Sequence, residues 1–368
     1  MDFSKYAEQL AALAAMSNKY GADPAYVLAG GGNTSFKSKE NLWVKGSGTS
    51  LATIRAEDFV VMDREALGQM WEKAYPAQEE ARESAVLADM MAARIPGESR
   101  RPSVETLLHD LFPQRYVLHV HPALVNGLTC SKGGAKVLAR LLPEAVWVEA
   151  CKPGYILALE CKKVMEARKA ATGKDVNLLF LENHGIFFAG DTVEAVEQLA
   201  SQVMDALAAQ IVKQPDLTPV AFEEGKAAEI AGWLKELYGA ETVLFCANAL
   251  IGGYDPTTES LSPDHIVYAK AKQLALPEAV DAAAVKELFG AFEAANGYKP
   301  RIAFWKSGMF AMGSSEKEAA TAQAVMLDAV KVTAYAESFG GVSPMPAFLI
   351  DFIINWEVER YRSNVSMK

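Results

Sequence analysis

The sequence predicts an α/β sandwich whose central sheet is mostly antiparallel. Strand-like and helical patterns alternate along the chain, which is typical of mixed α/β folds. Several strand candidates are joined by short turns instead of crossover helices, and short turns connect antiparallel neighbours. Apolar residues make up 51% of the chain and charged residues 22%, which is the composition of a globular protein. Together these observations favour a sandwich over a doubly wound parallel sheet.

The expected elements of the first hundred residues are a helix, three short strands and a second helix. Apolar residues recur at three- and four-residue steps from about Asp2 to Tyr20, which predicts an amphipathic helix. Strands are expected at Tyr26–Ala29, at Leu42–Val44 and within EDFVVMD, with glycine-rich turns beside the first two. The next helical pattern runs from Ala77 to Arg94.

The middle of the chain continues this alternation. PSVETLLHDLF is expected to be a helix, with Pro102 near its first turn and Ser103 as a candidate cap. Strands are expected in RYVLHVHPALVNG, in AVWVEA and in GYILALE, and KKVMEARKAAT predicts a helix stopped by Gly173. VNLLFLENHGIFFAG predicts two strands around a turn, and an Ala-rich helix follows from about Thr192 to Lys213.

A change in composition then divides the chain into two expected domains. KQPDLTPVAFEEG holds two prolines, several acids and few large apolar residues, so it is expected to be a linker. Beyond it, RIAFWKSGMFAMGSSEKEAATAQAVMLDAV echoes LLFLENHGIFFAGDTVEAVEQLASQVMDAL, and Gly185 and Gly190 align with Gly308 and Gly313 at an offset of 123 positions. We therefore expect a first domain at 1–213 and a degenerate second copy of part of it at 214–368. The second copy has Ser307 where the first has His184.

Charge and cysteine content limit the partners and the compartment. The net charge of -10 argues against nucleic acid or an anionic membrane as the main partner. No apolar run reaches the roughly 18 residues of a membrane helix, and the acidic start MDFSKYAEQL is unlike a signal peptide. The four cysteines form no CxxC pair, which is typical of free thiols in a reducing compartment. We therefore expect a cytoplasmic protein.

Three of the five histidines form a candidate metal site. His119 and His121 stand at alternate positions of a predicted strand, so their side chains project from the same face. His184, in the turn ENHG, is a natural third ligand, because catalytic zinc sites use three protein ligands and keep one position open. The alternative interpretation is three separate core histidines. His109 is expected to be a structural or supporting residue, and His265 has no partner motif.

Two glycine-rich turns form a second group of candidates. GGGNTS and KGSGTS combine tight turns with hydroxyl and amide side chains, and consecutive backbone N–H groups in such turns bind anions. Neither turn fits a nucleotide-binding pattern, which disfavours a nucleotide fold and leaves two interpretations: a binding site for a phosphate group, or two turns without a ligand. Glu105, taken alone, is most simply a carboxylate near the start of a helix.

In this order and spacing, GNTS, SGT, PSxE, HxH and NHG resemble the class II aldolase/adducin superfamily, from Gly30 to about Gly190. Its enzymes include fuculose- and rhamnulose-1-phosphate aldolases and ribulose-5-phosphate 4-epimerase. The C-terminal segments LSPDHIVYAK, SGMFAMG and NWEVERYR are similar to the aldolase part of bifunctional rhamnulose-1-phosphate aldolase/dehydrogenases, whose dehydrogenase half is not found before Lys368. The resemblance implies a three-layer sandwich.

The resemblance also implies a role for each matching residue. It makes His119, His121 and His184 the ligands of one Zn²⁺ per chain and Glu105 the catalytic acid/base. It places the substrate phosphate on Asn33, Ser47, Gly48 and Ser103. The family pattern often has a second serine where this chain has Val104, which leaves one phosphate hydrogen bond unassigned.

The implied activity is zinc-dependent retro-aldol cleavage of a ketose 1-phosphate, such as L-rhamnulose or L-fuculose 1-phosphate, to dihydroxyacetone phosphate and a small aldehyde. The implied partners are a phosphorylated sugar and further copies of this chain, as in the family's tetramers. Two alternatives remain: an epimerase or decarboxylase of the same superfamily, or a non-catalytic, adducin-like assembly module. Glu105 favours the aldolase over the epimerase, which usually has Asp there. The three histidines argue against the assembly module.

Overall fold

A computed structural model describes residues 3–356 of the chain, which divide into two compact units. Unit 1 comprises residues 1–125 and 135–209, and unit 2 comprises residues 126–134 and 210–368. In the segment up to residue 209 the helices are η1 (Phe3–Tyr6), α1 (Ala7–Gly21), η2 (Ala56–Asp58), α2 (Arg64–Met70), α3 (Glu79–Ala92), α4 (Thr106–Leu111), α5 (Ala123–Thr129), α6 (Gly134–Leu141), α7 (Tyr155–Thr172) and α8 (Val193–Ala208).

Unit 1 is built on a seven-stranded sheet in the order β3-β2-β1-β4-β7-β6-β5. Its strands are β1 (Asn33–Lys37), β2 (Asn41–Lys45), β3 (Phe59–Asp63), β4 (Tyr116–Val120), β5 (Val146–Val148), β6 (Leu178–Leu181) and β7 (Gly185–Gly190). Only β5 and β6 pair in parallel, and every other neighbouring pair is antiparallel. The predicted mixed fold with a mostly antiparallel sheet is confirmed.

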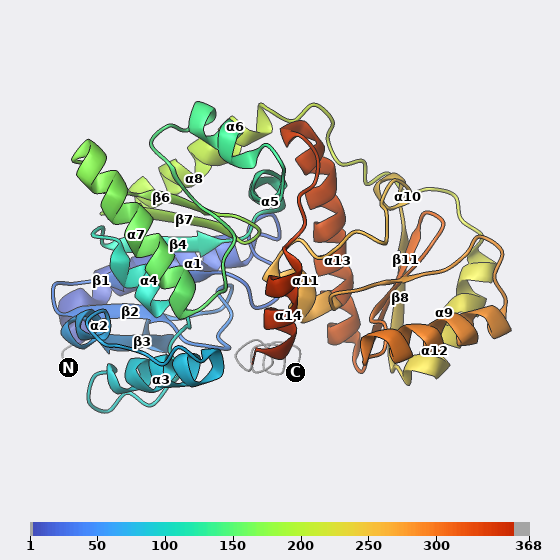
Figure 1. The fold of residues 1–368 in the computed structure, drawn as a ribbon, viewed down its shortest axis with the longest axis horizontal. Coiled ribbons are helices and arrows are strands. Elements are labelled where there is room, and N and C mark those ends of the chain that lie inside the picture. The colour runs from blue at the N-terminus through green and yellow to red at the C-terminus, as the bar shows by residue number, and fades with distance from the viewer. Residues whose placement is uncertain (1–2, 357–368) are drawn as a thin grey trace. The chain divides into compact units, whose positions relative to one another are not determined.

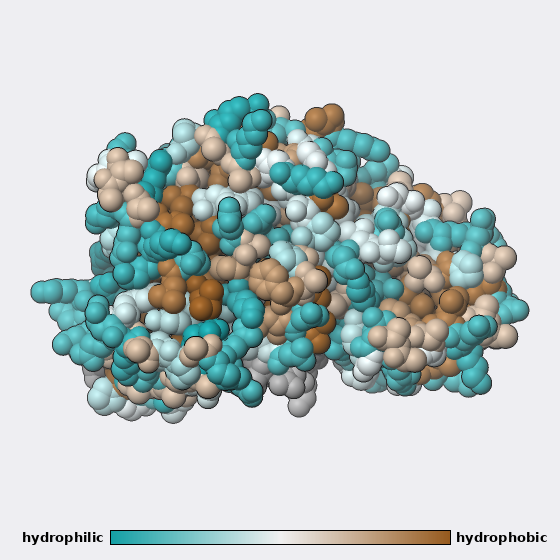
Figure 2. Space-filling model, viewed as in Figure 1, coloured by the Kyte–Doolittle hydropathy of each residue, from teal (hydrophilic) through white to brown (hydrophobic). Residues whose placement is uncertain are grey.

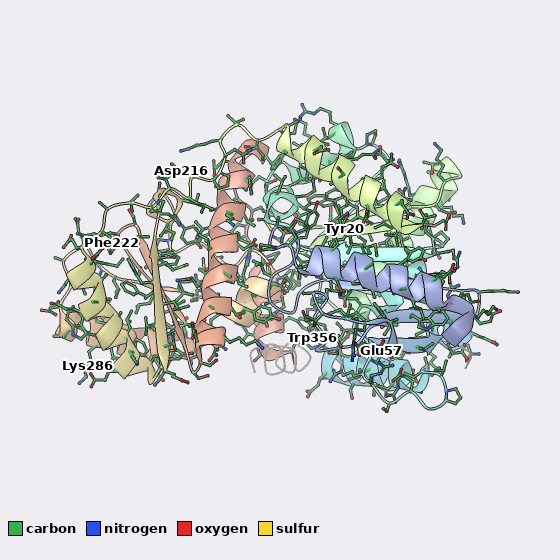
Figure 3. All side chains as sticks on the ribbon, turned by 180° about the vertical axis from the view of Figure 1, so that it is seen from behind. Tyr20, Glu57, Asp216, Phe222, Lys286 and Trp356 are labelled. Atoms are coloured by element: carbon green, nitrogen blue, oxygen red, sulfur yellow. The ribbon has the colours of Figure 1, made fainter. Side chains whose placement is uncertain are left out.

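Helices cover both faces of this sheet and complete three layers. α4 and α7 lie over the face seen in Figure 1, and α1 and α8 lie over the face seen from behind in Figure 3. The core under α4 and α7 is apolar and includes Leu107, Phe112, Leu157 and Phe187. Burial of apolar area at this interface, worth about 25 cal/mol per Å², is what attaches α4 to the sheet.

The structure corrects two of the predicted strands. Tyr26–Ala29 is a turn, and the strand instead begins at Asn33, inside the stretch expected to be a glycine-rich turn. GYILALE is not a strand: after Gly154, whose φ is 88°, it forms the first two turns of α7. The buried residues Tyr155, Ala158, Cys161 and Met165 have helical spacing, which continues into the predicted helix KKVMEARKAAT. The Ala-rich helix ends at Ala208, before the predicted Lys213.

Unit 2 has a four-stranded sheet in the order β8-β11-β10-β9. Its strands are β8 (Thr242–Ala247), β9 (Leu274–Ala275), β10 (Ile302–Trp305) and β11 (Gly308–Gly313). Its helices are α9 (Glu224–Tyr238), α10 (Ala249–Gly252), α11 (Pro263–Ala269), α12 (Ala282–Asn296), α13 (Glu316–Ala336), η3 (Glu337–Phe339) and α14 (Ala347–Asn355). Its core includes Ile230, Phe289, Trp305 and Phe310.

The sheet of unit 2 repeats four strands of unit 1 in the same order and directions. β4-β7-β6-β5 and β8-β11-β10-β9 both have two antiparallel pairs followed by a parallel one. The local details also recur 123 positions apart: Asn183 and Lys306 have φ of 55° and 52°, and Thr192 and Ser315 cap α8 and α13. The repeat predicted from the two aligned segments therefore extends over the whole four-stranded sheet.

The surface and the cysteines bear on where the protein can act. Within residues 3–356, no helix is both long and apolar enough to cross a membrane. Figure 2 shows hydrophobic residues reaching the surface of both units among a majority of hydrophilic ones. The four cysteines are free thiols, of which Cys130 and Cys161 are buried and Cys151 and Cys246 are half-buried.

Candidate metal centre

The three predicted histidines converge at one end of β4 in unit 1. His119 lies on β4, His121 lies just beyond its last residue, and His184 lies in the turn between β6 and β7. One ring nitrogen from each histidine lies within 4.8 Å of the other two. His119 Nε2 and His121 Nε2 are 2.9 Å apart. The imidazoles therefore face one point, as ligands of a common ion do.

The strand register brings this third histidine to the other two. β4 pairs antiparallel with β7, so that His119 lies opposite Phe187 and Val120 opposite Ile186. The β6–β7 turn therefore lies at the end of β4 from which His121 projects. Asn183 adopts the left-handed conformation in this turn, with φ of 55°, a conformation that asparagine tolerates better than most residues.

The surroundings of His119 fix its tautomer. His119 Nδ1 lies 2.9 Å from the carbonyl oxygen of Ile186, and because a carbonyl only accepts hydrogen bonds, Nδ1 carries the proton. Nε2 is then the ring nitrogen that faces His121 and Glu105. His119 is fully buried, and its ring stacks on Phe187 with 4.0 Å between centroids. A hydrogen-bonded, pre-oriented imidazole is the usual arrangement of a metal ligand, so these residues fit a zinc-like ion.

Glu105 faces the histidines from the start of α4, where it is the N-cap residue. Its Oε1 lies 3.3 Å from His119 Nε2 and 3.5 Å from His184 Nε2. Burial alone raises the pKa of this carboxyl, but the charges and hydrogen bonding of the facing histidines outweigh burial and hold the pKa well below its usual range. These contacts favour the ionised form of Glu105.

Two of the predicted phosphate ligands contact Glu105. Asn33 Nδ2 donates a short hydrogen bond to Glu105 Oε2, and Ser103 Oγ accepts one of 3.2 Å from the Glu105 backbone N–H. Asn33 also lies directly opposite His119 in the β1–β4 pair. These contacts hold the carboxylate beside the metal centre, which is a function that the sequence did not suggest for Asn33.

The second glycine-rich turn lies beside Ser103. The Ser47 N–H donates to the Arg101 carbonyl over 2.8 Å, and the Ser103 N–H donates to the Lys45 carbonyl over 3.1 Å. Gly48 is exposed and has φ of 84°, so the turn requires the backbone freedom of glycine there. The structure thus brings together all the predicted phosphate residues: Asn33, Ser47, Gly48 and Ser103.

Sequence reasoning missed the polar residues of β1 that hold α4. Ser35 Oγ lies 2.8 Å from His109 Nδ1, and Lys37 Nζ donates to the carbonyls of His109 and Phe112 over 2.6 and 2.8 Å. With Asn33, these alternate residues of one strand attach the helix that carries Glu105. A lysine at the end of a strand that follows a glycine-rich stretch gave no recognisable signal, because nothing in the sequence shows that it is buried.

The buried Lys37 predicts a pH dependence of stability. Burial lowers the pKa of Lys37 to about 7 from 10.5. Between these values the unfolded chain binds more protons, so the free energy of unfolding should rise with pH, by at most about 1.4 kcal/mol per pH unit. Denaturant titrations from pH 7 to 10 should show this rise in the wild type and in the exposed-neighbour control Lys39→Met. Lys37→Met should lack it, and an unchanged slope in that variant would contradict the assignment.

Gly185 lies so close to His121 that any side chain at residue 185 should displace the imidazole. A Cβ at residue 185 would lie 2.5 Å from His121 Cδ2 and 2.6 Å from the Val120 carbonyl oxygen. Gly185→Ala should therefore displace His121 and weaken metal binding by about 10- to 100-fold, the size of effect seen when ligand support is lost. Gly308→Ala, at the equivalent turn of unit 2, meets side chains as closely and should leave metal affinity unchanged. Competition with a chromogenic chelator measures both.

The remaining histidines lie outside the centre. His109 is fully buried on α4, and burial lowers its pKa well below the usual range, so it is neutral and structural. His265 lies in unit 2, where its Nε2 is 3.3 Å from Asp328 Oδ2.

Comparisons with known proteins concern the same half of the chain. A family model described as the class II aldolase and adducin N-terminal domain matches residues 11–211. The "Uncharacterized oxidoreductase YuxG" of Bacillus subtilis (strain 168) is 31% identical over 193 residues, which cover 50% of this chain and 26% of that protein. The chain thus spans about a quarter of the length of this curated relative.

Solved structures of similar proteins cover about half of the chain. The N-terminal class II aldolase domain of a conserved protein from Thermoplasma acidophilum is 26% identical, with a TM-score of 0.46, and the match covers 54% of this chain and 91% of that one. An L-fuculose-1-phosphate aldolase from Thermus thermophilus is 16% identical, with a TM-score of 0.37, over 55% of this chain and 93% of that one.

Proposed function

Because the chain belongs to the class II aldolase and adducin family, whose model matches residues 11–211, we propose that it is a metal-dependent aldolase. The proposed reaction is cleavage of a ketose 1-phosphate between C3 and C4, which yields dihydroxyacetone phosphate and a small aldehyde such as lactaldehyde. One zinc ion per chain is proposed at His119, His121 and His184. The observation that carries the proposal is the buried carboxylate of Glu105, 3.3 Å from His119 Nε2 and 3.5 Å from His184 Nε2.

The three histidines and Glu105 supply complementary parts of this chemistry. Three neutral imidazoles leave the full charge of a divalent ion in place, and such an ion, when bound, stabilises the negative charge that bond cleavage leaves beside the carbonyl. Glu105 begins as a carboxylate, so in the condensation direction it can remove a proton from C3 of dihydroxyacetone phosphate. In cleavage, the 4-hydroxyl loses its proton to solvent as the C3–C4 bond breaks and the aldehyde forms, and microscopic reversibility requires the protonated Glu105 to give a proton to C3.

The turn residues would hold the phosphate, away from the breaking bond. Ser47 and Ser103 offer hydroxyl groups and Gly48 offers a backbone N–H group, and such donors bind phosphate oxygens. A phosphate fixed there orients C3 towards Glu105, which lies two residues from Ser103. Asn33 would then donate its hydrogen bond to the Glu105 carboxylate in the free protein and to a substrate oxygen in the complex.

The experiment is a retro-aldol assay on L-rhamnulose and L-fuculose 1-phosphates, with dihydroxyacetone phosphate measured by a coupled dehydrogenase. Release of dihydroxyacetone phosphate from either sugar, lost on chelation and restored by Zn²⁺, is the expected result. Interconversion of pentulose phosphates or release of CO₂ from a sugar acid, without cleavage, would replace the proposal by an epimerase or decarboxylase. No bound metal and no turnover would favour an adducin-like assembly module. We also propose a cytoplasmic location and a homo-oligomeric state.

A further inference from the structure

β8 is an edge strand, whereas its counterpart in unit 1 is not. In unit 1, β4 has β7 on one side and β1 on the other. In unit 2, β8 has β11 on one side and begins the sheet. Within the described part of the chain, up to residue 356, the repeat therefore lacks any counterpart of β1, β2 and β3, and leaves unpaired the edge that β1 occupies in the first copy.

The register shows which residues face this edge. Phe187 of β7 and Phe310 of β11 correspond at the 123-residue offset, and they pair with His119 and Phe245. Phe245 therefore stands where the first copy has His119. β1 pairs with residues 116–119 of β4, so the equivalent open stretch of β8 is 242–245.

In β8, the backbone N–H and C=O groups of alternate residues point away from β11, towards the open edge of the sheet. The Asn248 N–H donates to the carbonyl of Ser307, which makes 242, 244, 246 and 248 the residues bonded to β11. The N–H and C=O groups of Val243 and Phe245 consequently point to the open edge. Within residues 3–356, no further backbone bond is made by 242–246 outside the sheet. The C-terminal end of this edge is covered, because Pro219 forms an antiparallel bridge with Asn248, the residue after β8.

β8 carries none of the devices that keep edge strands from pairing. Its sequence, TVLFCA, has no charge and no proline, and Thr242, Val243 and Phe245 are of types that are enriched in strands. Every residue of the strand is partly exposed, and Phe245 is 36% exposed. An unprotected edge of this kind is a binding surface for another strand.

We propose that β8 pairs antiparallel with β8 of a second copy of this chain, which makes one sheet continuous across a two-fold homodimer. In the proposed register, Val243 of each copy lies opposite Phe245 of the other, with Leu244 on the axis, so that the outward backbone groups of both residues are paired. This register forms four backbone hydrogen bonds. It also places Thr242 opposite Cys246 at a non-hydrogen-bonded position and juxtaposes no like charges. A charged peptide would find no complementary charge on this strand. The dimer does not depend on the proposed reaction.

A proline at the edge tests the pairing. Val243→Pro removes an N–H that faces the second copy but no bond to β11, so unit 2 should tolerate it. Light scattering after size exclusion should give twice the chain mass of 39.8 kDa for the wild type and for the control Val243→Ala. Val243→Pro should weaken dimerisation by about tenfold or more. A wild type that is monomeric at tens of micromolar, or a Val243→Pro variant that dimerises like the wild type, would overturn the proposal.

A cysteine crosslink tests the register independently of folding effects. Non-hydrogen-bonded antiparallel pairs place Cα atoms about 4.5 Å apart, which a disulfide can span. Thr242→Cys should therefore form a covalent dimer through Cys246 of the second copy under mild oxidation. Thr242→Ser and the double variant Thr242→Cys/Cys246→Ser should not. Failure of Thr242→Cys to crosslink in a dimeric preparation would rule out this pairing of β8.

Discussion

His121→Ala is expected to abolish both metal binding and ketose 1-phosphate cleavage. His121 supplies one of three imidazoles whose nitrogens lie within 4.8 Å of one another, and two remaining ligands hold a zinc-like ion weakly. A bound metal contributes several kcal/mol to stabilising a developing negative charge, so kcat/KM should fall by about a thousandfold or more. Elemental analysis and the cleavage assay on the same preparation measure the two effects.

The control for this variant is His265→Ala. His265 belongs to unit 2 and faces Asp328, so its loss should leave the metal content per folded chain unchanged. If His121→Ala retained one metal ion per chain and full cleavage, the three histidines would not be the metal centre.

Glu105→Gln is expected to keep the metal and lose the reaction. The amide is close in shape to the carboxylate, but it cannot take a proton from carbon, so turnover should fall by about 10²- to 10⁴-fold. KM should change far less than kcat, since the phosphate is held by other residues. Exchange of the C3 proton of dihydroxyacetone phosphate with deuterated solvent, followed by NMR, isolates the step assigned to Glu105.

The matched control is Glu57→Gln, at an exposed glutamate in the same unit. It should leave turnover, metal content and proton exchange as in the wild type. Proton exchange at the wild-type rate in Glu105→Gln would assign the acid/base role to another group.

The sequence predicted the cluster of His119, His121 and His184 because its signal is local. Two histidines at i and i+2 share a face of any strand, and a third histidine on a glycine turn can reach them. The family predicted from the motifs is confirmed by the match to residues 11–211. The support of the centre could not be predicted, because the Ile186 carbonyl and the polar residues of β1 act through pairings between distant segments.

The incorrect strand predictions have physical causes. GYILALE has the apolar density of a buried strand, and only its continuation into KKVMEARKAAT reveals a single helix, α7. The stretch after Gly30 was expected to be a turn because of its three consecutive glycines, but Asn33–Lys37 is held as a strand by partners on both sides. The open edge of β8 was also invisible in the sequence, since the absence of a neighbouring strand is a property of the whole sheet.

The most direct test of the metal-dependent aldolase is a reconstitution titration. Metal-free protein receives Zn²⁺ in steps, and the rate of dihydroxyacetone phosphate release is measured at each step. We expect no cleavage without metal and a linear rise that stops at one equivalent per chain, because unit 2 has Phe245 and Ser307 in place of His119 and His184. Cleavage by the metal-free protein, or a rise that continues to two equivalents, would contradict the account.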